Sequence, residues 1–381
     1  MNIEAFVGPV MGSYTGLDAT LTGADRIADG LVYFFVQGKF IALFSLLFGM
    51  GFAMMVQRAE AARRPFTGMY WRRSLALLGI GLAHALLLWS GDVLVTYALL
   101  ALLLPAFREA PAGMLAGLGL ACYLVAPALL LGLGVLSGQV PDWDAGMLEQ
   151  GRAMDAMLQA QRLAYGSGSY AVAVAQRVRD LGLTLSNLLV TAPMVFGMFL
   201  LGAAFLRGGV IQRPDLHPRL YRRLRLVVLP LGVLVMLASF LLEPTSSFDV
   251  FSLRQSLAQA LAIVASLMMC LGYLAWVMHA LQAPSGARWL GRLAPAGRMA
   301  LSNYLAQSLV CTLLFYGYGL GLFERLPRFW QVPFALGLFA LQVLYSRWWL
   351  ARFRFGPAEW LWRSITYWQL QPTRRPPSVA G

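Results

Sequence analysis

Three ionisable residues stand out in a chain that is otherwise strongly apolar. Lys39 is the only lysine, His84 is one of three histidines, and Asp92 follows His84 by eight positions. The sequence Ser90-Gly91-Asp92 predicts a tight turn that lets the carboxylate fold back toward the imidazole. A carboxylate that holds a histidine in one tautomer suits it to act as a general base on a hydroxyl or an amine. We therefore predict that His84, Asp92 and Lys39 form one catalytic site.

A second set of polar residues suggests binding rather than proton transfer. Asn303 and Gln307 are four residues apart and so share one helix face, and Gln342 and Arg347 can meet them. The alternative is that these amides only hold helices together. The binding residues that we predict are Asn187, Arg254, Asn303, Gln307, Arg347, Arg298 and Glu359. No metal site is predicted, because Cys122, Cys270 and Cys311 lie singly inside apolar runs.

Composition shows what kind of scaffold must hold these residues. Hydrophobic residues make up 59% of the 381 positions, charged residues make up 12%, and the mean hydropathy is +0.65. These values exclude an ordinary soluble domain. In lipid, an apolar run must be helical to satisfy its backbone. We therefore predict an all-α, polytopic membrane domain over residues 1–381, with nine spans at about 31–56, 74–90, 93–107, 112–137, 183–206, 226–242, 255–281, 299–322 and 330–350.

The charges between the runs predict the orientation. The formal net charge is +13. In a protein with many spans, basic residues collect in the loops on the cytoplasmic side of a bacterial inner membrane, where they meet anionic lipid. The positive charge therefore does not indicate nucleic-acid binding. Residues 1–30 and 138–182 carry mostly acidic charges, and we expect them outside the cytoplasm. The tail, residues 351–381, is expected in the cytoplasm. The cytoplasmic arginines are 58, 63, 64, 72 and 73, then 207, 213, 219, 222, 223 and 225, then 288, 292 and 298, and finally 352, 354, 374 and 375.

The long connection at 138–182 has a pattern of its own. Between residues 144 and 165, Glu149, Arg152 and Asp155 share a helical face with other polar residues, and Met147 and Met154 lie opposite. This pattern predicts an amphipathic helix on the outer membrane surface. A simple spacer is the alternative.

Depth in the membrane links Lys39 to His84. Lys39 lies about eight residues into the first run, and His84 lies about seven residues before the outer turn. At about 1.5 Å per residue, both lie about 10 to 12 Å below the outer surface. A charge at that depth needs a partner or water. The alternative is that Lys39 extends outward to the interface and that His84 is a hydrogen-bonded core residue.

Four segments resemble a known family: GKFIALFSLLFGMGFA, RRSLALLGIGLAHALLLWSGDVLVTYAL, GRMALSNYLAQS and GPAEWLWRSITY. They resemble the bacterial YeiB family, which is defined by domain of unknown function 418. That family is distantly similar to transmembrane acyltransferases such as heparan-alpha-glucosaminide N-acetyltransferase. The resemblance implies a histidine that helps to move an acyl group from cytoplasmic acyl-CoA to an extracytoplasmic acceptor.

The beginning of the chain departs from the family pattern. Relatives have an additional first helix that ends in a pattern like LLVNI before an aromatic residue, and Asn2, Ile3 and Phe6 look like the end of that pattern. We therefore expect a ten-helix parent whose gene model here begins at an internal methionine. In the similar acyltransferases the catalytic histidine follows that first helix. Residues 1–30 contain no histidine, so His84 is not the equivalent residue.

Two functions from different classes follow. The first is acyl transfer from acyl-CoA, with no tightly bound cofactor, to a sugar or lipid-linked acceptor. In it His84 is the general base, and Arg288, Arg292 and Arg298 attract the phosphates of the donor. The second is a transporter or flippase for a small anionic or lipid-linked solute. In it Lys39 and Arg254 are the outer charges, and Asn303, Gln307 and Arg347 form the inner site.

Overall fold

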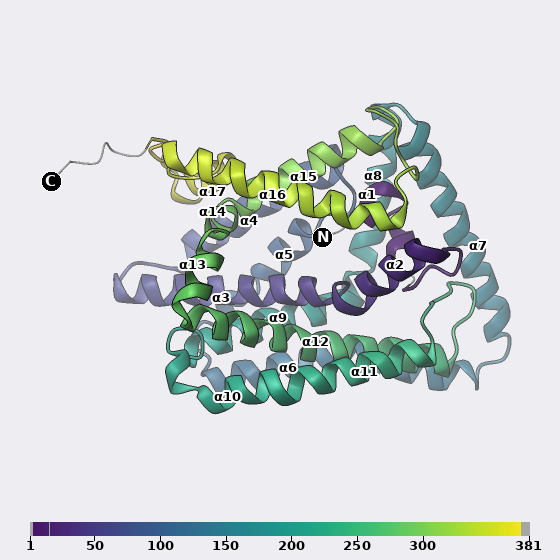
Figure 1. The fold of residues 1–381 in the computed structure, drawn as a ribbon, viewed down its shortest axis with the longest axis horizontal. Coiled ribbons are helices and arrows are strands. Elements are labelled where there is room, and N and C mark those ends of the chain that lie inside the picture. Colours follow the sequence, from purple (N-terminus) through teal and green to yellow (C-terminus); the bar gives the residue numbers. More distant parts are fainter. Residues whose placement is uncertain (1–2, 15, 375–381) are drawn as a thin grey trace.

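The computed structural model describes residues 3–14 and 16–374, and it is helical throughout this part of the chain (Figure 1). Asn2 and Arg375, which enter the predictions above, lie outside the described residues. The helices, apart from short 3₁₀ and π turns, are α1 (Glu4–Val7), α2 (Gly23–Phe35), α3 (Lys39–Ala61), α4 (Thr67–Leu87), α5 (Leu94–Ala101), α6 (Ala112–Ser137), α7 (Trp143–Gln161), α8 (Tyr170–Ser186), α9 (Leu188–Arg207), α10 (Pro218–Arg223), α11 (Leu229–Leu242), α12 (Leu253–Gln282), α13 (Pro284–Gly291), α14 (Ala294–Arg298), α15 (Ala300–Phe315), α16 (Arg328–Arg352) and α17 (Pro357–Tyr367).

In the described part of the chain, six helical segments are long and apolar enough to cross a membrane: Gly23–Ala61, Ala112–Ser137, Leu188–Arg207, Pro218–Leu242, Leu253–Gln282 and Arg328–Arg352. They confirm the all-α class and support six of the nine predicted spans. The predicted span at 93–107 differs most, because α5 has 8 residues and rises only about 12 Å. A length of that order does not cross roughly 30 Å of hydrocarbon. Composition marked this segment as apolar but did not reveal that its helix ends at Ala101.

The charged segments sort to opposite ends of the molecule. In Figure 1, α10, α13 and α17 lie at the left, and α7 lies at the right. We call the left end, with the arginines of α10, α13 and α17, the arginine-rich end, and the right end, with α7 and the start of α2, the acidic end. α7 coincides with the predicted amphipathic segment. Glu149, Arg152 and Asp155 on it are exposed, whereas Met147 and Met154 are half-buried.

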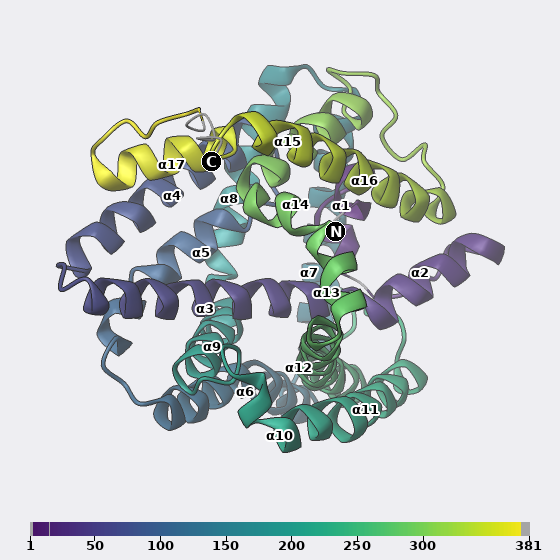
Figure 2. The same ribbon diagram turned by 60° about the vertical axis from the view of Figure 1, so that its left-hand side comes forward.

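The long helix α3 divides the molecule into two groups of helices. Figures 1 and 2 both show α6, α9, α11 and α12 on one side of α3, and α4, α5, α15, α16 and α17 on the other. We call the first group, together with α3, the apolar half, and the second group the polar half. α9 packs between α3 and α6, and α12 packs against α6 and α11.

Close backbone contacts hold the apolar half together. A Cβ atom added at Gly49 on α3 would overlap the carbonyl oxygen of Phe199 on α9, and one added at Gly202 on α9 would overlap that of Leu46 on α3. Small residues allow such approach between helices in lipid, where apolar side chains gain little by leaving the hydrocarbon. This interface therefore depends on the absence of side chains at two positions.

Candidate functional site

The polar half contains a continuous chain of three hydrogen-bonded side chains. Nδ1 of His84 lies 2.7 Å from Oδ1 of Asp92, and Nε2 of His84 lies 2.7 Å from Oγ of Ser308. His84, Asp92 and Ser308 are all buried, with exposed fractions of 1%, 7% and 0%. The structure therefore joins the predicted pair His84–Asp92 and adds a serine that sequence reasoning did not identify.

The hydrogen bonds that Asp92 accepts fix the position of the proton on the imidazole. Oδ2 of Asp92 accepts a hydrogen bond from the backbone N–H of Val95 at 2.7 Å, and Oδ1 accepts one from the hydroxyl of Tyr304 at 3.4 Å. With Asp92 ionised, its carboxylate only accepts hydrogen bonds. Nδ1 of His84 therefore carries the proton and donates a hydrogen bond to Asp92. Nε2 is then the acceptor for the hydroxyl of Ser308. This is the proton arrangement of a serine next to its general base.

Local sequence explains the position of Asp92. Asp92 lies just before α5, and its carboxylate accepts a hydrogen bond from the backbone N–H of Val95, three residues further along the chain. Residues at helix N-termini commonly make this bond. The same side chain therefore stabilises the start of α5 and holds His84 at the end of α4. The sequence Ser90-Gly91-Asp92 forms the predicted turn between the two helices.

A buried arginine from another helix fixes the end of α4. Arg177 on α8 donates to the carbonyl oxygen of Leu87 at 3.0 Å and to the hydroxyl of Tyr318 at 2.8 Å. Tyr170 also donates to the carbonyl oxygen of Leu87, at 2.9 Å. A cation at a helix C-terminus is favourable because carbonyl groups there lack partners. Arg177 thus acts on the site by positioning the turn that carries Asp92.

Helix α15 brings Ser308 to the histidine. Tyr304 and Ser308 lie one helical turn apart, and the ring of Tyr304 packs 4.8 Å from that of His84, measured between centroids. Trp89 closes another side with its ring edge toward His84, at 6.3 Å, and stacks on Phe6 of α1 at 4.0 Å. Aromatic rings therefore surround the imidazole and separate it from bulk solvent.

A cavity of about 310 Å³ lies beside Ser308. Ser308 lines it, whereas His84, Asp92 and Lys39 do not. Its other walls come from α1, the junction of α2 and α3, and the start of α16, and they include Glu4, Gln37 and Arg328. A molecule in this cavity would therefore lie next to the residue whose hydroxyl is hydrogen-bonded to the imidazole.

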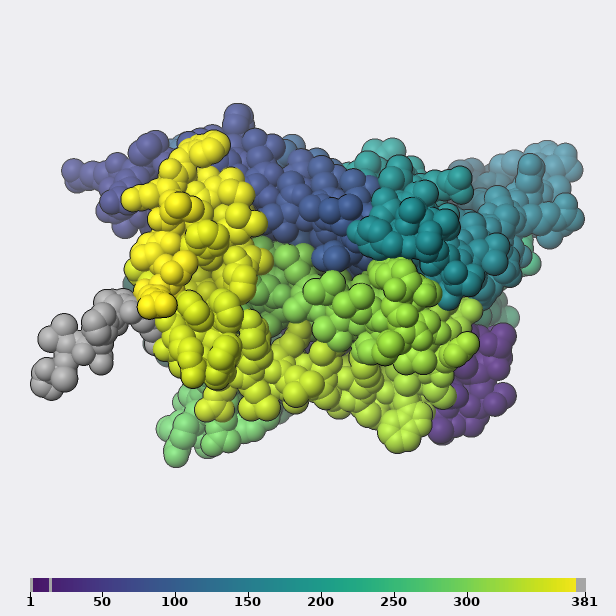
Figure 3. Space-filling view, turned by 90° about the horizontal axis from the view of Figure 1, so that it is seen from above, coloured from purple at the N-terminus to yellow at the C-terminus, as the bar shows by residue number. Residues whose placement is uncertain are grey.

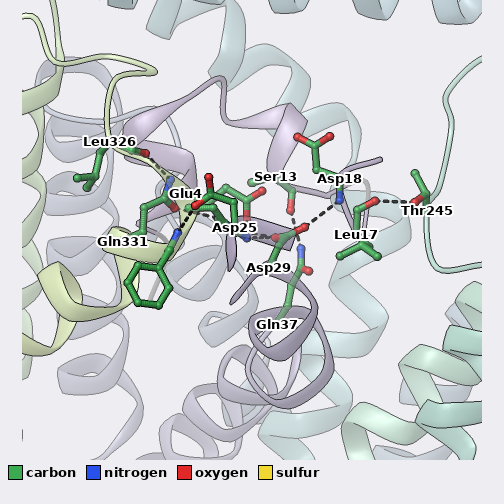
Figure 4. A network of polar contacts seen from close by, with 12 residues as sticks. Glu4, Ser13, Leu17, Asp18, Asp25, Asp29, Gln37, Thr245, Leu326 and Gln331 are labelled. Atoms are coloured by element: carbon green, nitrogen blue, oxygen red, sulfur yellow. Dashed lines mark hydrogen bonds and ion pairs between the residues drawn. The ribbon is translucent and has the colours of Figure 1, made fainter. Parts of the chain in front are cut away.

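Arg328 forms a buried charge cluster on the same cavity, and Figure 4 shows its partners Glu4, Asp29 and Gln331 close together. Its guanidinium donates to Asp29 at 2.7 Å, to Glu4 at 2.6 Å and to the amide oxygen of Gln331 at 2.9 Å. Asp29 also accepts from the backbone of Asp18 at 2.8 Å. Burial raises the pKa of Glu4 to about 7, although Arg328 acts in the opposite direction. The cavity thus contains a carboxyl group that can exchange a proton near neutral pH.

Lys39 takes part in a different contact. It is the first residue of α3, and its ammonium group donates to the carbonyl oxygen of Tyr33 at 2.9 Å and lies 3.6 Å from the sulfur of Met236 on α11. The chain turns between α2 and α3, and Lys39 satisfies a carbonyl that the end of α2 leaves free. No hydrogen bond joins it to His84 or Asp92 within the described residues. Its contacts are those of a helix-terminal residue facing the apolar half.

The second predicted group is brought together in part. Asn303 donates to Ser346 of α16 at 3.0 Å, Gln307 donates to Gln342 at 2.7 Å, and Gln342 donates to the carbonyl oxygen of Asn303 at 2.8 Å. Arg347 is exposed and takes no part in this network. One face of α15 therefore contacts α16, and the adjacent face contacts His84.

The other predicted binding residues are separate from both groups. Asn187 is exposed at the junction of α8 and α9, and Arg298 is exposed at the end of α14. Arg254 pairs with Glu243 at 3.3 Å on the surface. Glu359 on α17 accepts from the backbone N–H of Ser302 at 3.0 Å, at the start of α15. These contacts link neighbouring elements and do not converge on a cavity. Nor do three or more metal-binding side chains gather anywhere in residues 3–14 and 16–374.

A second cavity lies at the arginine-rich end and has a volume of about 430 Å³. It is formed by the end of α3, the start of α4 and helix α17, and Phe48 lines it. Phe48 meets Tyr97, which lines the first cavity, with ring centroids 5.5 Å apart. Aromatic side chains therefore separate the two cavities.

Ser308 and Arg328 are the main residues that sequence reasoning missed. Each pairs with a residue far along the chain: Ser308 with His84 and Arg328 with Asp29. The sequence contained only a weak signal for Ser308. Ser308 follows Tyr304 by four residues, which places the two on one face beside the face of Asn303 and Gln307.

Comparison with known families and proteins agrees with the resemblance noted from the motifs. Residues 205–369 match a family model described as protein of unknown function (DUF418). The chain is 34% identical over 368 residues to the uncharacterized protein YxaH of Bacillus subtilis, covering 93% of this chain and 86% of that protein. It is 32% identical over 381 residues to the uncharacterized protein YeiB of Escherichia coli, covering 96% and 91%. No solved structure matches.

Proposed function

This chain belongs to the YeiB (DUF418) family, and we propose that it is a membrane acyltransferase in which Ser308 carries the acyl group. One observation carries the proposal: a buried serine that lines a cavity has its hydroxyl hydrogen-bonded to a histidine that is itself held by a carboxylate. The proposal shifts the reacting role from His84, as expected from sequence, to Ser308 with His84 behind it.

The first half of the reaction acylates the serine. Oγ of Ser308 attacks the carbonyl carbon of an acyl donor, while Nε2 of His84 accepts the hydroxyl proton and Asp92 stabilises the resulting imidazolium. When the carbon–sulfur bond of an acyl-CoA breaks, the thiolate leaves with the proton from His84. An ester of Ser308 and neutral His84 remain.

The second half transfers the acyl group. An acceptor hydroxyl or amine attacks the ester carbon, and His84 takes the acceptor proton and then returns it to Oγ of Ser308. A cavity walled by aromatic side chains limits the access of water, which would otherwise hydrolyse the ester. Phe40, Ile41 and Phe44 line the cavity and are also 38–48% exposed on the outside of α3. This supports a lipid-linked acceptor, or a sugar on a lipid carrier, as the molecule that enters.

Orientation completes the proposal. We place the arginine-rich end in the cytoplasm and the acidic end outside, in a bacterial inner membrane, because basic residues favour the cytoplasmic side. The cavity beside Ser308 is then nearer the outer side, with Glu4 and Arg328 at its wall. Single cysteines introduced at 145 and 219 test this orientation, since only the first should react with a membrane-impermeant maleimide in intact cells.

The serine is tested directly by labelling. Purified protein incubated with acyl-CoA should release free thiol and give a Ser308 peptide heavier by the acyl group, as measured by mass spectrometry. Ser308→Ala should lose both signals, by at least about 10³-fold in rate. Ser346→Ala is the matched control, because Ser346 is also fully buried on a neighbouring helix but contacts Asn303. Thiol release that persists in Ser308→Ala would overturn the proposal.

Transport is the second candidate, and the two cavities favour it. Both cavities lie between α3 and the polar half, and aromatic side chains separate them, as in an occluded pathway. A transporter needs no nucleophile at Ser308. Solute uptake by proteoliposomes that is equal in wild type and Ser308→Ala, without thiol release, would favour transport over acyl transfer.

A further inference from the structure

The cavity at the arginine-rich end has a chemistry of its own. Arginine side chains from three helices and a loop line it: Arg58 from α3, Arg64 from the following loop, Arg73 from α4 and Arg363 from α17. Figure 3 shows the yellow C-terminal segment against the dark blue segment that contains α4, and α17 packs on α4. Four arginine side chains therefore line one open cavity, in which Arg73 is half-buried and the other three are also exposed to solvent.

These arginines lack the partners that would neutralise them. Within residues 3–14 and 16–374, no carboxylate lies within 4.0 Å of any of the four guanidinium groups. Arg73 stacks on the ring of Trp362, 3.5 Å from its centroid, and Arg363 lies 4.7 Å from the ring of Phe355. Such stacking fixes the direction of a guanidinium and leaves its N–H donors available for hydrogen bonds.

A buried hydroxyl in the same wall also lacks a partner. Tyr70 is 2% exposed and lines the cavity, and among the described residues its hydroxyl makes no hydrogen bond of good distance and angle, with the hydroxyl of Ser74 as a neighbour. Buried polar groups are usually satisfied, and an exception calls for an explanation such as a missing ligand. A ligand oxygen in the cavity would satisfy this hydroxyl and the arginines together.

We infer that this cavity binds a phosphate-bearing anion. Guanidinium groups match the geometry and charge of phosphate oxygens better than other side chains do, and a volume of about 430 Å³ is typical of small-molecule sites. Arginines whose only role is to set the orientation of the protein in the membrane need not line one cavity together with a hydroxyl that lacks a good hydrogen bond. The phosphate comes from a soluble polyphosphate or from a phospholipid headgroup, and the experiment below separates these sources. The inference does not depend on acyl transfer.

The test measures the thermal stability of the purified protein in nanodiscs. In neutral phosphatidylcholine discs, pyrophosphate and ATP are titrated as soluble probes. In a second set, phosphatidylglycerol replaces part of the lipid. A ligand that binds the folded state raises the melting temperature as its concentration increases. Stabilisation by a soluble probe in neutral discs supports the inference with a soluble source, and stabilisation only in anionic discs supports it with a lipid source.

Variants show whether the cavity is responsible. Arg58→Gln and Arg64→Gln should each weaken the stabilising ligand about tenfold, because each removes a charge-assisted hydrogen bond. Arg222→Gln is the matched control, because Arg222 on α10 is an exposed arginine at the same end that does not line the cavity. Ser308→Ala should bind the ligand as the wild type does, which separates this test from that of the proposed reaction. Absence of stabilisation in both sets of discs, or an equal loss in Arg222→Gln, would overturn the inference.

Discussion

The two halves of this bundle are held together by different means. In the apolar half, α3 and α9 approach so closely that Gly49 and Gly202 leave no space for a side chain. In the polar half, side-chain hydrogen bonds join the helices. One links His84 on α4 to Ser308 on α15, and another links α15 to Gln342 on α16. One interface requires small residues, and the other requires correctly placed donors and acceptors.

The difference shows where chemistry can occur. Close backbone packing leaves no volume for a ligand, whereas side-chain hydrogen bonds keep helices apart and leave cavities between them. Both cavities described above border the polar half. The apolar half contributes α3, which forms a wall of each. We therefore expect changes in the apolar half to affect folding and changes in the polar half to affect activity more than folding.

The largest effect is expected for Gly49→Leu. Its side chain would force α3 away from α9, because it would occupy the position of the Phe199 carbonyl, and overpacking of this kind costs about 3 kcal/mol or more. Folded protein in the membrane should be nearly absent, as measured by fluorescence-detected size-exclusion chromatography. Gly51→Leu is the control two residues away, where a Cβ meets nothing within 4 Å. Equal yields from the two variants would show that the close approach is not essential.

A second effect is expected for Asp92→Asn in the polar half. The amide nitrogen of asparagine can donate to Nδ1 of His84, which would shift the proton to Nε2 and leave Ser308 without an acceptor. Thiol release from acyl-CoA should fall by about 10³- to 10⁴-fold, as for the comparable change in serine hydrolases. Asparagine still stabilises a helix N-terminus, so the melting temperature should change little. A variant that loses folded protein in proportion to activity would make the role of Asp92 structural.

Part of this arrangement could be predicted from sequence because it is local. His84 and Asp92 are eight residues apart with a turn between them, and Asn303 and Gln307 are one helical turn apart. Their proximity follows from the geometry of a helix and a turn. The long apolar runs likewise predicted the all-α class, because hydrocarbon leaves a single helix no other way to satisfy its backbone.

The remainder depends on contacts between distant segments. Depth placed Lys39 level with His84, but depth does not fix the direction in which a side chain points around the helix. Lys39 contacts Tyr33 and Met236, whereas the imidazole meets Ser308. Serine is common in membrane helices, and Arg328 lies between two predicted spans, where no sequence pattern singles it out. Only the packing of α15 on α4, and of α16 on α2, gives these residues their partners.

A third effect is expected at the ion pair between α2 and α16. Asp29→Asn leaves the buried guanidinium of Arg328 with Glu4 as its remaining acidic partner. Breaking a buried pair typically costs about 3–5 kcal/mol, and Glu4 should keep the loss at the lower end. Unfolding in mixed micelles would measure it.

Two further variants control this measurement. Glu324→Gln removes a pair with Arg162 in which both side chains are more than 40% exposed, and such pairs contribute at most about 1 kcal/mol. The double variant Asp29→Asn with Arg328→Gln should recover part of the loss, because no unpaired charge remains. An equal loss from Glu324→Gln would mean that burial of the Arg328 cluster contributes nothing.

The smallest effect expected is the pH dependence that arises from Glu4. Its pKa rises from the ordinary value of 4.5 to about 7 in the folded protein, mainly through burial, so between these values the folded state binds more protons than the unfolded state. Stability then decreases as pH rises through this window. The melting temperature of the wild type should fall between pH 5 and pH 8 by more than that of Glu4→Gln, whereas Glu60→Gln at the arginine-rich end should follow the wild type. If Glu4→Gln retained the full decrease, the group that titrates between pH 5 and pH 8 would lie elsewhere in the protein, and the charge of Glu4 at the cavity wall would not change in this range.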